Sequence, residues 1–134
     1  VSKAEIESRL ASLNGPVTLV GHSVGGSVLL KWLCDSHVPR SVAGLFVVAA
    51  PFWGADDFWR WDEVRLPPEA AAKLAGDWPL FFYHSRDDET VPFGHLALYA
   101  AALPRAAIRA LDGRGHQLCN DLTEVAADIR QDRH

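Results

Sequence analysis

In the segment VTLVGHSVGGSVLLKWL (residues 17–33), a short apolar run leads directly into the pattern G-x-S-x-G. The run 17–20 is apolar and β-branched, as expected of a strand that is buried on both faces of a sheet. The residues after Gly25 form a broad apolar face and favour helix. This order predicts a nucleophile elbow, a sharp turn that exposes the hydroxyl of Ser23. We expect Gly21 and Gly25 to leave space where strand and helix come close.

Length, composition and charge describe an ordinary globular domain. The chain has 134 residues, of which 49% are hydrophobic and 22% charged, and its net charge is −4. Because it has no basic stripe and no apolar run of about 20 residues, neither nucleic acid nor a membrane is expected as a partner. The oligomeric state stays open.

Two further observations concern the origin of the chain. Cys34 and Cys119 have the spacing of neither a disulfide framework nor a metal site, so we interpret them as reduced, buried thiols of a cytoplasmic protein. The sequence starts at Val1 and contains no Met. We therefore expect a single domain, 1–134, whose N-terminal part is incomplete.

Helical and strand patterns alternate along the chain, which is typical of a parallel α/β sheet. A first helix is expected to begin at a capping box, residues 2–5, and to end before Gly15. Strands are expected at 17–20, 42–50, 80–84 and 106–111, and further helices at 24–34, 92–103 and 121–130. Residues 52–78 are irregular and rich in Trp, with one short helical piece after Pro68. In such sheets, functional side chains gather at the carboxyl ends of the strands.

The polar residues at these strand ends are the ones that nucleophilic catalysis requires. A serine hydroxyl needs a base to take its proton, and the base needs a third group to orient it. After the strand 80–84 come two acids, Asp87 and Asp88, and after the strand 106–111 comes His116. Ser23, one of these acids and His116 can therefore converge despite their separation in sequence.

These motifs together resemble those of the α/β-hydrolases. In that family the acid usually lies in D-x-x-V-P, which residues 88–92 match, and this favours Asp88 over Asp87. The catalytic histidine usually follows a small turn that contains glycine, as residues 113–116 do. The compact size, the spacings and the Trp-rich segment 52–59 are similar to small serine hydrolases of the retinoblastoma-binding-protein-9 and YdeN type.

The resemblance implies a fold and an activity. The fold is a three-layer, doubly wound, mainly parallel α/β sheet without its N-terminal strands. The activity is hydrolysis of small esters, or possibly amides, through Ser23, His116 and Asp88 and an acyl-enzyme, with no cofactor and no metal.

The oxyanion hole is the point at which the sequence departs from the family. One donor is expected to be the N–H of Val24, directly after the nucleophile. The second usually comes from a loop after an earlier strand, and nothing precedes the first helix here. Either the chain is a fragment, or a partner supplies the loop, or this form is inactive; we favour a fragment.

Several other residues allow two interpretations. His22, Trp53 and Trp59 are candidates for a substrate pocket, although tryptophans more often anchor loops. His84 either packs in the core or braces the site, with core packing favoured, and His95 is expected to be solvated or packed. Acids between 56 and 63 are interpreted as a solvated loop rather than metal ligands. Two other functions stay open: a binding or regulatory protein that has lost turnover, and an acyl transferase or lyase on the same fold.

Overall fold

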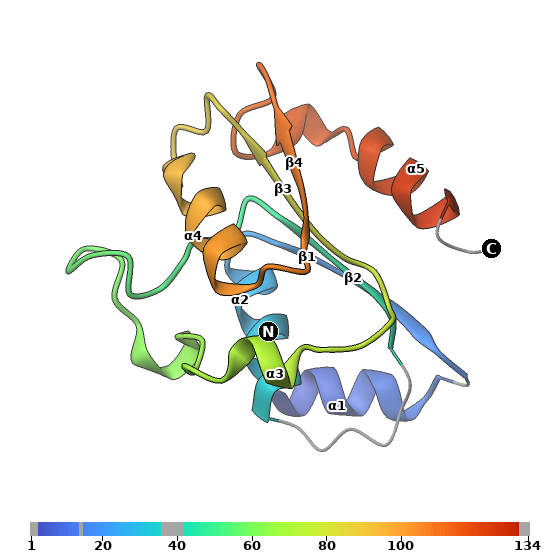
Figure 1. Ribbon diagram of the computed structural model, residues 1–134. Coiled ribbons are helices and arrows are strands. Elements are labelled where there is room, and N and C mark those ends of the chain that lie inside the picture. Colours follow the sequence, from blue (N-terminus) through green and yellow to red (C-terminus); the bar gives the residue numbers. More distant parts are fainter. Residues whose placement is uncertain (1–2, 14, 36–41, 132–134) are drawn as a thin grey trace.

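The structure, a computed structural model, describes residues 3–13, 15–35 and 42–131. One parallel sheet forms its centre, with the strands β1 (Val17–His22), β2 (Val42–Val48), β3 (Leu80–Ser85) and β4 (Ala107–Leu111) side by side in chain order (Figure 1). Since all four strands run the same way, their carboxyl ends lie at one edge of the sheet. The predicted parallel α/β architecture is confirmed.

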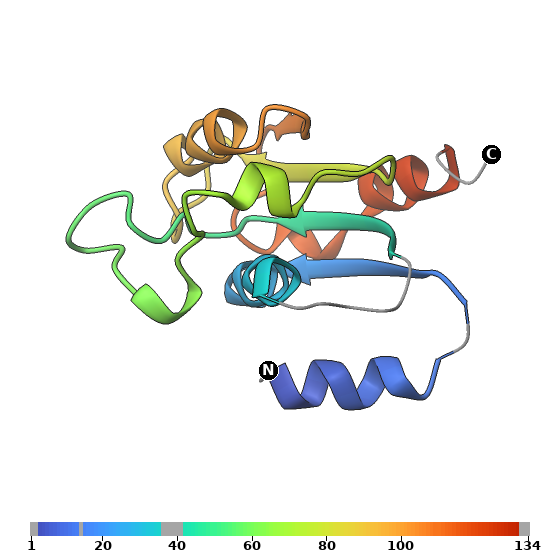
Figure 2. The ribbon, with the colours of Figure 1, turned by 60° about the horizontal axis from the view of Figure 1, so that its bottom comes forward.

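Helices cover the two faces of the sheet unequally. The helices α2 (Val24–Asp35), α3 (Ala70–Lys73) and α4 (Gly94–Ala102) lie on one face, and α5 (Thr123–Gln131) lies on the other (Figure 1). The helix α1 (Lys3–Ala11) packs against α2 through Ile6, Leu10 and Trp32, at the β1 end of the molecule (Figure 2). Two 3₁₀ turns, η1 (Asp62–Val64) and η2 (Leu118–Asn120), complete the chain.

Side-chain alternation along β2 divides the core into two clusters. Leu45 and Val47 point to the layer of α2 and α4, whereas Phe46 and Val48 point to α5. All six residues of β3 are buried as well. The two central strands therefore carry the core, as apolar strands covered on both faces should. No helix in the described ranges is long and apolar enough to cross a membrane.

Strand β1 differs from the prediction, because it is not buried on both faces. It is an outer strand of the sheet, paired among the described strands only with β2, and Val20 is 45% exposed. The reason is that α5 packs over β2 and β3 and does not reach β1. The first helix ends at Ala11, earlier than expected, so Leu13 lies beyond its end and is 47% exposed. Ser2, the first residue of the predicted capping box, lies outside the described residues.

The two cysteines differ in burial. Cys34 is buried as expected, and burial raises the pKa of its thiol to about 11. Cys119 is exposed, so the prediction of two buried thiols is wrong for this residue. It lies in η2, where three successive residues adopt positive φ. Both thiols are free.

The close contact between β1 and α2 involves Gly21 as predicted, but its partner is Gly26 rather than Gly25. A Cβ at Gly21 would lie 2.6 Å from the Cα of Gly26, and a Cβ at Gly26 would lie 2.7 Å from a methyl group of Val47. A Cβ at Gly25 would meet nothing within 4 Å. The first turn of α2 thus presents Gly26 to the sheet and Gly25 away from it.

Two neighbouring substitutions test this assignment. Gly26→Ala is expected to lower the free energy of unfolding by about 1–3 kcal/mol, because the added methyl group overfills a packed contact. Gly25→Ala should be neutral or raise the stability by up to about 1 kcal/mol, because alanine favours helix more than glycine does. Urea unfolding of both variants measures the difference, and equal losses in the two would contradict the assignment.

Candidate active site

Ser23 lies at the turn between β1 and α2, in a strained backbone conformation. Its φ is +56°, in the left-handed region that residues with a side chain rarely adopt. The Ser23 N–H donates to the carbonyl of Val48 at 2.7 Å, and the Ser23 carbonyl accepts from the amides of Gly26 and Ser27 at 3.0 and 3.3 Å. Backbone bonds on both sides therefore hold the strained residue in place.

Three side chains from three strand ends form one line of hydrogen bonds. Ser23 Oγ lies 2.9 Å from His116 Nε2, and His116 Nδ1 lies 2.9 Å from Asp88 Oδ2. The His116 side chain is nearly buried, and that of Asp88 has no exposed surface. A proton on Nδ1 faces the carboxylate, which leaves Nε2 to accept the hydroxyl proton of Ser23.

The carboxylate of Asp88 is surrounded by N–H groups. Its Oδ1 accepts from the amides of Thr90 and Val91, both at 2.8 Å, and its Oδ2 accepts from His116. A second histidine, His84, brings its Nε2 to 3.2 Å from the same Oδ2. Burial raises the pKa of Asp88, but the bonds from His116, Val91 and Thr90 outweigh it, so the pKa lies below its ordinary value. Asp88 is therefore ionised at neutral pH.

The neighbours of Asp88 hold the backbone next to His116. In the acid loop (residues 86–93), Asp87 Oδ1 accepts from the Gly115 amide at 3.0 Å, and Glu89 Oε2 accepts from the His116 amide at 3.3 Å. Asp87 also accepts from the hydroxyl of Ser85. The histidine loop (residues 112–117) is thus bound by three consecutive carboxylates. Arg86, the residue before Asp87, pairs instead with Asp112 at 2.8 Å.

His22, a candidate pocket residue, contacts the same histidine from the elbow. Its Nε2 donates to the backbone carbonyl of His116 at 2.8 Å, and the two rings lie 5.0 Å apart. Val24, the expected oxyanion donor, is the first residue of α2, so its N–H has no acceptor within the helix. Ser23, Val24 and His22 therefore converge with His116 at the carboxyl edge of the sheet.

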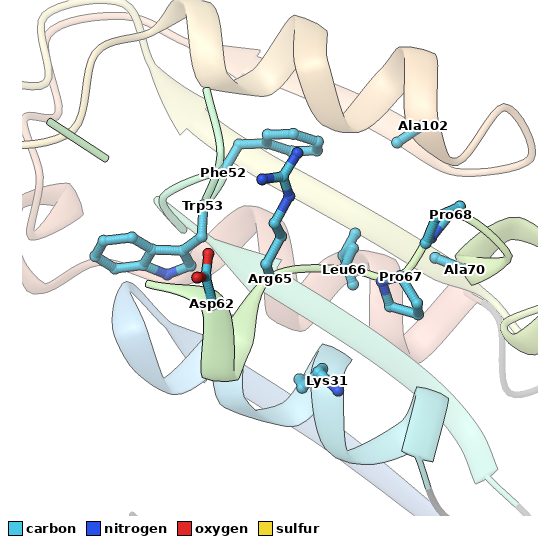
Figure 3. A pocket seen from close by; sticks show the side chains of 10 residues that line it. All are labelled: Lys31, Phe52, Trp53, Asp62, Arg65, Leu66, Pro67, Pro68, Ala70 and Ala102. Atoms are coloured by element: carbon cyan, nitrogen blue, oxygen red, sulfur yellow. The ribbon is translucent and has the colours of Figure 1, made fainter. Parts of the chain in front are cut away.

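A cavity of about 520 Å³ lies between α2, α4 and the irregular segment (Figure 3). Trp53 lines it together with Phe52, Leu66 and three charged side chains, Lys31, Asp62 and Arg65. Trp59 does not line it and instead packs against Trp53 and against the buried ring of His95. His22 and the three residues of the hydrogen-bonded line do not border this cavity either.

The remaining polar candidates are structural. Asp56 accepts from the amides of Phe58 and Trp59 at 2.9 and 3.0 Å and so shapes the tip of the irregular segment. Among the described residues, no three His, Cys, Asp or Glu side chains gather as metal ligands would. His95 is packed, and its Nδ1 accepts from the Phe52 amide at 2.8 Å.

Comparisons with known proteins agree with this architecture. The sequence profile of a family described as "Serine hydrolase" matches residues 3–121. Comparison with curated proteins finds no match. Among solved structures, the esterase domain of a Rhodothermus marinus protein has a TM-score of 0.68 and 19% identity, over 96% of this chain and 65% of that chain.

Two further structures are similar to the same extent. SOBER1 of Arabidopsis thaliana has a TM-score of 0.66 and 21% identity, over 98% of this chain and 61% of that chain. CarC, a serine hydrolase involved in carbazole degradation, has a TM-score of 0.73 and 15% identity, over 98% of this chain and 70% of that chain. These likenesses confirm the expected α/β-hydrolase fold. The chain spans 65% and 61% of the length of the first two structures.

The acid loop generates a prediction about stability and pH. The hydrogen bond from Ser85, followed by that from the Gly115 amide, lowers the pKa of Asp87 below its ordinary value of 3.8. A carboxylate whose pKa is lower in the folded state stabilises the fold above its ordinary pKa, and this contribution is lost as the pH falls through the folded value. Asp87→Asn should therefore reduce the free energy of unfolding at neutral pH and make little difference near about pH 2. Urea unfolding at both pH values checks this. A loss in the free energy of unfolding that is the same at both pH values would contradict it.

Proposed function

The chain belongs to the serine hydrolase family, and on that premise we propose that it hydrolyses small esters, with amides as the second candidate substrate class, and that Ser23 is the nucleophile. The observation that carries the proposal is the line Ser23–His116–Asp88, with both hydrogen bonds at 2.9 Å. A strained, half-buried serine whose hydroxyl lies beside an imidazole nitrogen is the arrangement that acyl transfer needs.

The proposed mechanism assigns one role to each group. His116 Nε2 takes the proton of Ser23 as Oγ attacks the substrate carbonyl, and Asp88 stabilises the imidazolium that forms. The N–H of Val24 donates to the oxyanion of the tetrahedral intermediate. His116 then protonates the leaving group, and water, activated by the same imidazole, releases the acyl group from Ser23. No metal or cofactor takes part in this sequence of steps.

The pocket and the location of the protein are proposals as well. The irregular segment is our candidate for recognising the substrate, because the indole of Trp53 donates to Ser27 Oγ, one turn beyond Ser23 in α2. The cavity in Figure 3, which Trp53 also lines, does not border Ser23. A cytoplasmic location agrees with two cysteines that are both free.

A catalytically weak binding protein is the second candidate, and one observation favours it. In the described part of the chain, Val24 is the one backbone donor that we assign to the oxyanion, and a single donor stabilises the intermediate less than a pair. Labelling of Ser23 by a fluorophosphonate probe separates the two functions, because a binding protein of this kind would retain the fold but would not react at Ser23.

The nucleophile is tested by labelling with a fluorophosphonate probe. The wild-type chain should be labelled at Ser23, as located by mass spectrometry, and Ser23→Ala should not be labelled. A folded wild-type chain that stays unlabelled would favour the binding protein. Labelling that persists in Ser23→Ala would overturn the assignment of the nucleophile.

The acid is tested by comparing its two neighbours. Asp88→Asn is expected to lower kcat for a p-nitrophenyl ester by about 10⁴-fold, because His116 loses its orienting charge. Asp87→Asn should cost less than about tenfold, because Asp87 bonds to the Gly115 amide and not to the imidazole. A reversal of the two effects would make Asp87 the catalytic acid.

A further inference from the structure

His84 contacts the proposed triad from behind. It is the second-last residue of β3, four positions before Asp88, and only 1% of it is exposed. Its Nε2 lies 2.9 Å from the carbonyl oxygen of Val91 and 3.2 Å from Asp88 Oδ2. A carbonyl oxygen cannot donate, so Nε2 carries a hydrogen and donates it to Val91, with the Asp88 carboxylate directly beside this N–H group.

We propose that His84 is a positioning residue, which fixes the Asp88 carboxylate in the orientation that holds His116. This inference rests on the proposed function, since it concerns the acid of the same triad. It assigns to a side chain on a rigid strand the task of aligning a side chain on a loop, an arrangement that preorganised sites require.

The balance of donors at Asp88 supports this role over simple core packing. A carboxylate offers about four acceptor positions, and three are filled here by two amides on Oδ1 and by the imidazole of His116 on Oδ2. The N–H of His84 lies beside Oδ2, with Nε2 at 3.2 Å. Because the side chain is wholly buried, water cannot replace a missing donor. An apolar residue at position 84 would fill the same space beside Phe93 and leave Oδ2 with His116 alone.

The contact with Val91 extends the effect to the backbone. Val91 both donates its N–H to Asp88 Oδ1 and accepts at its carbonyl from His84. The imidazole therefore joins β3 to Val91 of the acid loop and lies beside the carboxylate that the Val91 amide also holds. Movement of either point would change the distance between Asp88 and His116, and misplacements of about 1 Å are costly in catalysis.

The charged and titratable groups near His84 are few. Asp88 faces it from the acid loop, and His95 lies on the α4 side, where burial and then the charge of His84 lower the pKa of His95. The partial positive charge of the His84 N–H lies next to Asp88 Oδ2, so its removal leaves more negative charge directed at His116. That change favours the protonated form of His116. The acid limb of the kcat/KM profile, the pH range in which activity falls as His116 gains a proton, therefore moves to higher pH.

Two amide substitutions separate the donor from the rest of the side chain. Glutamine places its NH₂ group near the position of Nε2, whereas asparagine places it near Nδ1 and cannot reach Asp88 in the same way. For a p-nitrophenyl ester, His84→Gln should keep kcat within about threefold of wild type, whereas His84→Asn should lower kcat by roughly 10- to 100-fold with KM little changed. The acid limb of kcat/KM should move to higher pH in His84→Asn only.

A control and a second readout keep the outcomes distinct. His95→Asn alters another buried histidine, one that does not contact Asp88, and should leave the acid limb in place. Proton NMR of the full chain follows the hydrogen of His116 Nδ1, whose resonance should shift or broaden in His84→Asn and not in His84→Gln. Thermal unfolding reports whether each variant is folded.

The possible results then lead to different conclusions. Suppose that the wild type reacts with the fluorophosphonate, and that both His84 variants retain the kcat, the acid limb and the His116 resonance of the wild type. His84 is then a core residue, so the inference fails while the proposed function stands. If the wild type does not react, the proposed function fails, and the His116 resonance alone decides whether His84 positions Asp88. Equal losses in both variants with an unmoved acid limb would also overturn the inference.

Discussion

A buried negative charge at Asp88 is the constraint on which the arrangement of the loops depends. An unpaired carboxylate without contact to water is costly in a protein interior, so the chain must bring donors to it. Those donors come from the acid loop through its own amides and from the histidine loop through His116, and β3 places the N–H of His84 beside the same carboxylate. Satisfying one charge therefore fixes three segments relative to one another.

The acid and histidine loops are held at more than this one point. Asp87 and Glu89 bind successive amides of the histidine loop, and Arg86 pairs with Asp112 at its start. Those surface contacts are individually weak. They act together, however, on a loop that the parallel pairing of β3 and β4 already places nearby. The rigid sheet supplies the approximate position of His116, and the carboxylates supply the final one.

The sequence predicted the parts of this site that follow from topology. Ser23, Asp88 and His116 each follow a strand, and parallel strands bring their carboxyl ends together whatever the loops do. Roles that depend on the path of a loop could not be read in the same way. His84 belongs to an apolar strand pattern, and its contact with Asp88 exists only because the acid loop turns back over it. Likewise, the assignment of the close contact to Gly26 depends on how α2 rotates as it leaves the turn.

The irregular segment combines a fixed base with an exposed tip, and this division follows from where its polar bonds lie. At the base, the carbonyl of Pro51 accepts from the buried hydroxyls of Ser27 and Tyr99, and the indole of Trp53 donates to Ser27 Oγ. Ser27 is one turn beyond the nucleophile in α2, so the cavity wall and the elbow share one helix. At the tip, Phe58 is 83% exposed, and the turn there is held by Asp56 from within the segment itself. Changes at the tip can therefore alter what the segment contacts without disturbing the helix that holds Ser23.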